Sequence, residues 1–130
     1  MHKGYLLTAA GLGALAVVLG AFGAHALKKI ATDQQLTTFE TGVRYLFYHL
    51  FALALTALLF KDYPTAGVVL SGKLFIVGMI LFSGSLFLLT GFSVSGFQQF
   101  RWIGAITPIG GLCLIVAWLN LAFSIYSYKR

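Results

Sequence analysis

Residues 5–27 read YLLTAAGLGALAVVLGAFGAHAL, an apolar stretch that carries no Asp, Glu, Lys or Arg. As a helix that rises about 1.5 Å per residue, this stretch would cross a hydrocarbon core of roughly 30 Å. A cleaved signal peptide is the alternative, because Ala24-His25-Ala26 has the small-x-small pattern of a cleavage site. The stretch is longer than a usual signal core of roughly 7–15 residues. We therefore predict a retained transmembrane helix at approximately residues 5–27.

Three more apolar stretches follow the first. We expect them to form helices at approximately residues 33–60, 71–90 and 102–126. Thr32 and Gln35 have the spacing of a capping box, which marks the start of the second helix. The predicted fold is all-α: a polytopic membrane protein with four transmembrane helices in a compact bundle, formed by a single domain over residues 1–130.

The composition indicates that the bilayer is the solvent. Hydrophobic residues make up 59% of the chain and charged residues only 9%, whereas charged residues make up roughly 25% of ordinary soluble domains. The formal net charge is +6, but Lys and Arg occur singly or in pairs, mostly at the ends of apolar runs. We therefore expect the lipid bilayer as their partner and no nucleic acid. The lone Cys113 excludes an internal disulfide.

The positive residues also bear on orientation, because four crossings place both termini on one side. That side carries Lys3, Lys61, Lys73, Lys129 and Arg130, and the opposite side carries Lys28, Lys29, Arg44 and Arg101. The small excess on the side of the termini predicts that both termini are cytoplasmic.

The motifs of common enzyme classes are missing from the sequence. There is no Walker loop, no His-Glu-x-x-His and no Gly-x-Ser-x-Gly elbow. The three carboxylates, Asp33, Glu40 and Asp62, lie outside the deep part of every predicted span. We therefore predict no catalytic residue, no metal site and no cofactor.

One ionisable side chain, His49, is predicted to lie near the centre of the bilayer. Counted back from Phe60 at about 1.5 Å per residue, it lies about 17 Å deep, and Ser83, counted forward from Ser71, reaches about 18 Å. An intramembrane ionisable residue is by default a candidate functional site. The alternative is a neutral histidine that serves helix packing alone. The candidate intramembrane polar site comprises His49, Tyr45, Ser83, Ser85 and Thr107.

A second group of polar residues is expected nearer the membrane surface, where His25, Glu40 and Arg44 form a candidate interfacial group. Glu40 precedes Arg44 by four residues, the favourable order for a helical ion pair, although Glu40 could serve His25 instead. Asn120, near the far end of the fourth span, is expected to hydrogen-bond to another helix.

Small residues at helical spacing predict the packing faces, because they let two helix backbones approach closely in lipid. The first span has such a stripe at Gly13, Ala16, Gly20 and Ala24. We assign helix packing to the glycines Gly13, Gly20, Gly23, Gly78 and Gly84.

Four motifs resemble those of the small bacterial membrane proteins typified by YwdK and YgdD. In order, they are residues 19–25 (LGAFGAH), 45–49 (YLFYH), 82–86 (FSGSL) and 107–111 (TPIGG). The resemblance covers nearly the whole chain and implies a four-helix protein of the bacterial plasma (inner) membrane. It implies no activity.

These observations favour a membrane protein without enzymatic activity that acts as an accessory or self-associating subunit. We expect a homo-oligomer or a place in a larger membrane complex. The alternative is a minimal transporter or channel subunit that binds a proton, ion or small solute at the layer around His49. An enzyme that acts on a lipid or quinone is a third, weaker hypothesis.

Overall fold

The computed structural model describes residues 1–129 and confirms the all-α, four-helix fold. Four long helices cross the molecule: α1 (Lys3–Ala24), α2 (Asp33–Leu59), α3 (Ala66–Val94) and α4 (Ile106–Tyr126). Two short 3-10 segments, η1 (Leu27–Lys29) and η2 (Gln98–Ala105), lie in the connections. All four helices are long and apolar enough to cross a membrane.

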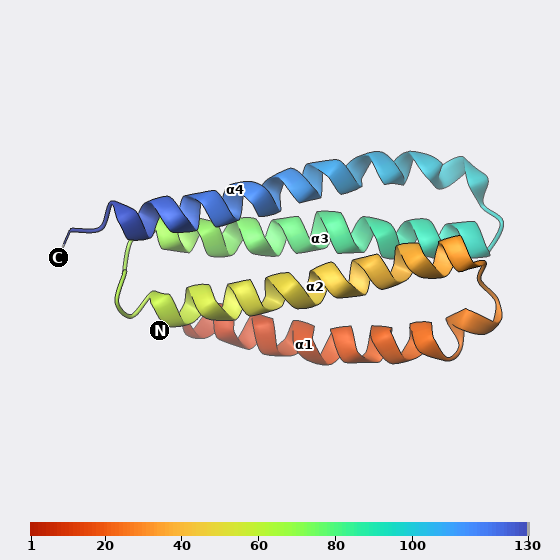
Figure 1. The fold of residues 1–130 in the computed structure, drawn as a ribbon, viewed down its shortest axis with the longest axis horizontal. Coiled ribbons are helices and arrows are strands. Elements are labelled where there is room, and N and C mark those ends of the chain that lie inside the picture. Colours follow the sequence, from red (N-terminus) through yellow and green to blue (C-terminus); the bar gives the residue numbers. More distant parts are fainter. Residues whose placement is uncertain (130) are drawn as a thin grey trace.

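The helices lie side by side in the order α1, α2, α3, α4, so α1 and α4 form opposite edges of the row (Figure 1). The most extensive contacts join α3 to α4, then α2 to α3, then α1 to α2. Each helix therefore packs mainly on its neighbour in the sequence. Both termini lie at one end of the row (Figure 1).

Side-chain caps explain where three of the helices begin. Thr32 and Gln35 form the predicted capping box of α2: the Thr32 hydroxyl accepts from the Gln35 N–H, and the Gln35 side chain accepts from the Thr32 N–H. His2 caps α1 through a hydrogen bond from the Tyr5 N–H to its Nδ1, and Thr65 caps α3. These caps satisfy N–H groups that have no partner within the helix.

Two helices have bounds that differ from the sequence prediction. The third runs from Ala66 to Val94 instead of residues 71–90, because Thr65 caps it one turn earlier. The fourth α-helix begins at Ile106 instead of residue 102, after the 3-10 turns of η2. Pro108 then falls in the first turn of α4, where a missing N–H removes no intrahelical hydrogen bond.

Close backbone contact holds α4 to α3, and a side-chain hydrogen bond holds α1 to α3. Gly110 of α4 lies against the backbone of α3 at Leu81 and Phe82. Near the start of α1, the Tyr5 hydroxyl donates a hydrogen bond to the Val69 carbonyl at 2.7 Å and links α1 to α3.

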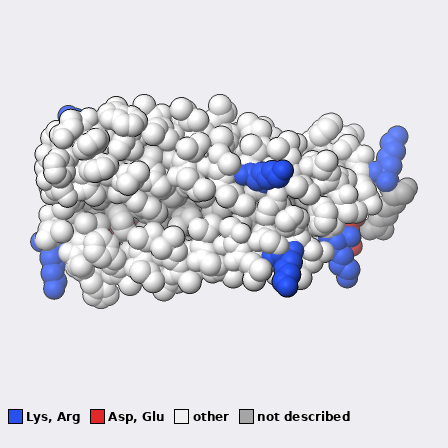
Figure 2. All heavy atoms as spheres, turned by 180° about the vertical axis from the view of Figure 1, so that it is seen from behind, with Lys and Arg blue, Asp and Glu red and all other residues white. Residues whose placement is uncertain are grey.

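The outer surface suits a lipid environment. Figure 2 shows a face that is mostly uncharged, with its few Lys and Arg side chains at both ends and in the half nearer the termini. In α1, only 17% of the most apolar stretch is buried, compared with 44% in α2. The edge helix therefore presents most of its side chains to the bilayer.

Candidate functional site

The motif residues of α2, α3 and α4 meet around residues 82–86 of α3. The Ser85 and Thr107 hydroxyl oxygens lie 2.6 Å apart and form a hydrogen bond between α3 and α4. The Tyr45 ring packs on Phe82, with 4.6 Å between the ring centroids. Three of the four sequence motifs therefore converge at one level of the row.

Ser83 links α3 to α2 at the same level. Its side chain is only 2% exposed, and its hydroxyl donates to the Gly42 carbonyl at 2.7 Å. That carbonyl is a backbone group of α2, so the bond holds two helices together without involving His49.

His49 is buried, with 7% of its surface exposed. Its Nδ1 lies 2.7 Å from the Tyr45 carbonyl of the preceding turn. A carbonyl only accepts, so Nδ1 carries the hydrogen in this bond. The ring lies among aromatic neighbours: Tyr45 on its own helix, Phe75 of α3 at 6.1 Å and Trp118 of α4 at 6.4 Å between centroids.

The structure does not place His49 in one layer with Ser83. His49 lies beside Phe75, whereas Ser83 bonds to Gly42, about 10 Å further along α2 at 1.5 Å per residue. The predicted depth of Ser83 is wrong because α3 begins at Ala66, about one turn before Ser71. The predicted polar layer therefore separates into two groups, an aromatic one around His49 and a hydroxyl group at Ser83, Ser85 and Thr107.

The interfacial residues are arranged differently from either sequence expectation. His25 Nδ1 bonds to the Ala21 carbonyl of its own helix at 2.9 Å, so its bond is not directed at Glu40. Glu40 and Arg44 line a hollow of about 310 Å³ between α1 and α2, and no ion pair joins them among residues 1–129.

The assigned packing glycines fall into two sets. A methyl group on Gly23 would meet Phe39 of α2 at 2.9 Å, one on Gly78 would meet Leu114 of α4 at 2.5 Å, and one on Gly20 would lie 3.7 Å from Val43. These three lie at contacts between helices of the chain. By contrast, Gly13 and Gly84 have open space at that position.

Asn120 hydrogen-bonds to another helix, as predicted. Its side-chain amide donates to the Gly67 carbonyl and to the Ser71 hydroxyl of α3, both at 2.7 Å. This is the α3–α4 hydrogen bond nearest the chain termini. No group of three or more His, Cys, Asp or Glu that could hold a metal ion occurs in the described part of the chain.

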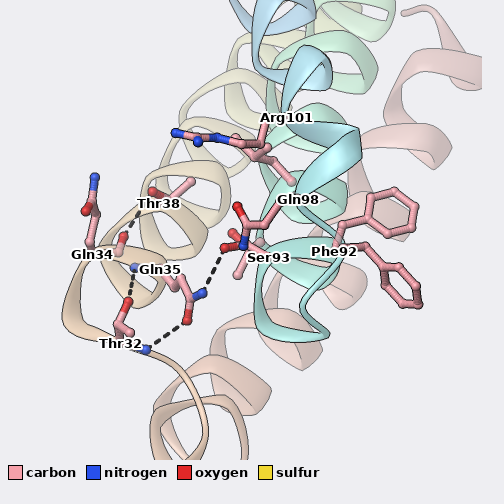
Figure 3. Close-up of a pocket in the computed structure, with 11 residues that line it drawn as sticks. Thr32, Gln34, Gln35, Thr38, Phe92, Ser93, Gln98 and Arg101 are labelled. Carbon is pink, nitrogen blue, oxygen red and sulfur yellow. Dashed lines mark hydrogen bonds between the residues drawn. The ribbon is translucent and has the colours of Figure 1, made fainter.

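A polar pocket that the sequence did not predict lies at the end of the row opposite the termini. The pocket has a volume of about 320 Å³ and lies between the start of α2, the end of α3 and η2. Figure 3 shows its central contact, a 2.8 Å hydrogen bond from the Gln35 amide to the Ser93 hydroxyl, with the Arg101 side chain extended toward Thr38. The capping-box spacing marked Gln35, but nothing in the sequence indicated that Ser93 and Arg101 would face it.

Four apolar helices, joined by interhelical hydrogen bonds, define a polytopic helical membrane protein. The family described as "Protein of unknown function (DUF423)" matches residues 19–111, and the chain belongs to that family. This confirms the resemblance that the four motifs predicted.

Individual relatives cover nearly the full chain. The UPF0382 membrane protein YwdK of Bacillus subtilis (strain 168) is 39% identical over 115 residues, which are 88% of this chain and 89% of the relative. A UPF0382 membrane protein of Haemophilus influenzae is 36% identical over 132 residues, 99% of this chain and 98% of the relative. The UPF0382 membrane protein C1782.12c of Schizosaccharomyces pombe is 36% identical over 84% of this chain and 90% of the relative. No solved structure matches the chain.

Proposed function

We propose that the chain is a membrane subunit without enzymatic activity of its own, which works by association with copies of itself or with a larger membrane complex. The observation that carries this proposal is that the polar side chains in the interior are engaged in hydrogen bonds, several of them between helices. Ser83, Ser85 and Asn120 each bond to a neighbouring helix, and every fully buried side-chain nitrogen or oxygen among residues 1–129 has a partner. Such groups join helices and stabilise the row.

The outer face of α1 supports association at the edge of the row. Ala10, Ala14, Val17 and Ala21 are exposed and recur at spacings of three and four, so they share one side of the helix. Small side chains allow a helix of another chain to approach closely in lipid. This face is separate from Gly20 and Gly23, which lie toward α2.

We further propose that the chain resides in the bacterial plasma (inner) membrane with both termini in the cytoplasm. Relatives named as membrane proteins occur in Bacillus and Haemophilus, which supports the bacterial assignment. The orientation rests on the bias of positive residues in the sequence, one of which, Arg130, lies outside the described residues.

Native mass spectrometry of the protein extracted from its own membrane tests the proposal. We expect an assembly of two or more copies or a stable complex with another membrane protein. Ala14→Leu should reduce the assembled fraction, since it adds bulk to the small-residue face. Leu15→Phe is the control, because it adds bulk at an exposed position about 100° around α1 from Ala14. A single chain carrying only lipids would refute the proposal.

A second candidate function is a minimal transporter or channel subunit, and the His49 ring supports it. With the hydrogen on Nδ1, the neutral ring presents Nε2 as an acceptor, and Nε2 has no hydrogen-bond partner among residues 1–129. The site for a proton, ion or small solute would then consist of His49 and Tyr45, with Phe75 and Trp118 beside them.

Flux measurements in proteoliposomes distinguish the two functions. For a transporter, the native protein would carry a pH-dependent flux that His49→Gln abolishes. An absence of flux for protons, common cations and small solutes would eliminate this candidate and favour the accessory role.

A further inference from the structure

The pocket between α2, α3 and η2 differs in chemistry from the apolar outer faces of the helices. Eight of its eleven lining residues are polar, and Arg101 is the single charged one. In a protein with 9% charged residues, such a concentration of polar side chains around a volume of about 320 Å³ suits a polar ligand better than a lipid chain.

The hydrogen bonds inside the pocket leave donors available. The Thr32 oxygen accepts from the Gln35 N–H, and the Ser93 oxygen accepts from the Gln35 amide, so neither bond uses a hydroxyl hydrogen. The Gln35 amide keeps a second hydrogen, because the bond to Ser93 uses one of two. Arg101 adds guanidinium N–H groups, which only donate. Two other hydroxyls, those of Thr38 and Thr90, donate to carbonyls of their own helices.

The charge of the pocket favours an anion. No Asp or Glu lines it, so the Arg101 charge is not neutralised by a neighbouring carboxylate there. The start of α2 lines the same space with the positive end of its helix dipole, and the carboxylate of that first turn, Asp33, is not among the lining residues. Guanidinium groups bind phosphate through paired hydrogen bonds.

The surroundings suit a phosphate group at the membrane surface. The pocket lies at the end of the row that also carries Lys28 and Lys29, which follow α1. Beside it, Phe92 and Phe100 stack with 4.3 Å between their centroids, and they form an apolar flank together with Phe97. A polar pocket next to an apolar flank matches the two parts of a phospholipid.

We propose that this pocket binds an anionic phosphate group, held by Arg101 and by the Thr32, Gln35 and Ser93 donors. The phosphate comes from a lipid headgroup or from a soluble phosphate, and both sources have the same recognition chemistry. This site goes beyond the proposed accessory function and does not depend on association between chains.

Calorimetric titration of the full chain in a non-ionic detergent tests the site. The probes are dioctanoyl phosphatidylglycerol and inorganic phosphate, each added at about 0.3 M salt, where long-range surface attraction is screened. Arg101→Gln removes the guanidinium. Arg44→Gln is the matched control, since it removes one positive charge from an exposed residue outside the pocket. Ser93→Ala removes one donor and keeps the helix.

Saturable binding is expected, weakened about tenfold or more by Arg101→Gln, to a smaller extent by Ser93→Ala, and by less than about twofold by Arg44→Gln. Binding of both probes would identify phosphate itself as the ligand, and binding of the lipid alone would identify a phospholipid headgroup. Three outcomes would refute the proposed site. They are a lack of saturable binding by both probes, native affinity in Arg101→Gln, and equal weakening of binding by Arg101→Gln and Arg44→Gln.

Discussion

Replacing Gly110 with alanine should force the α3 and α4 backbones apart. A methyl group at this position would lie 2.8 Å from the carbonyl carbon of Leu81 and 2.8 Å from the Cα of Phe82. Ordinary contacts of such atoms are about 3.5–4.0 Å. The atoms in the way belong to the backbone, so no side-chain rotation can relieve the overlap, and the two helices must separate by roughly 1 Å.

The expected loss of stability follows from this displacement. Overpacking a well-packed site destabilises a protein by typically about 1–3 kcal/mol. Alanine in the middle of a helix is itself more favourable than glycine by roughly 0.5–1 kcal/mol in water. We therefore expect Gly110→Ala to lower the free energy of unfolding by about 1–2 kcal/mol. The Ser85–Thr107 bond, one turn away between the same two helices, should weaken with it.

The neighbouring glycine provides a control within the same turn. A methyl group on Gly111 would lie 3.6 Å from Cδ2 of Phe82, an ordinary contact with a side chain. Gly111→Ala should therefore leave stability unchanged or raise it slightly. The measurement is reversible unfolding in mixed detergent micelles by titration with dodecyl sulfate. Equal stabilities for the two variants would refute the close backbone contact between α3 and α4.

Three other predictions test separate parts of the structure. Asn120→Leu should lower the free energy of unfolding by about 1–2 kcal/mol in the same assay, because it removes two bonds to α3; unchanged stability would contradict that role. His49→Leu should lower the free energy of unfolding by less than about 1.5 kcal/mol, because the bond that is lost joins His49 to a carbonyl of its own helix and the Ser83 bond to Gly42 stays intact. Loss of the folded state would contradict this prediction. Tags placed at either terminus should both be accessible from the cytoplasmic side only, and tags on opposite sides would refute four crossings.

Hydropathy and cap spacing were sufficient to predict the four helices. The long apolar runs have few alternative structures in lipid, because only helices and closed barrels satisfy the backbone there. Thr32 and Gln35 defined the start of α2 through a local bond that spacing alone reveals. Asn120 was predictable for a similar reason, since a carboxamide among apolar residues needs a partner on another helix.

The register between helices could not be predicted. The apolar residues surround α1, α3 and α4 on nearly every side, so the sequence does not indicate which residue of one helix faces which residue of the next. Contacts such as Gly110 on Phe82 fix that register, and an error of one turn at the start of α3 was enough to place Ser83 beside His49. The phosphate pocket was hidden for the same reason, because Gln35 and Ser93 are far apart in sequence.

The pairing of each helix mainly with its neighbour in the sequence bears on how the chain folds during synthesis. A ribosome releases a nascent chain from the N-terminus, and segments that emerge first can pack before the rest exists. In this chain α1 finds its main partner once α2 has emerged, and α3 then adds to an existing edge. No helix has to wait for a distant segment before most of its contacts form, so little chain entropy is lost in closing long loops. The Tyr5 bond to Val69 is an exception that forms only when α3 arrives, and it would complete the packing of the first three helices before α4 is inserted.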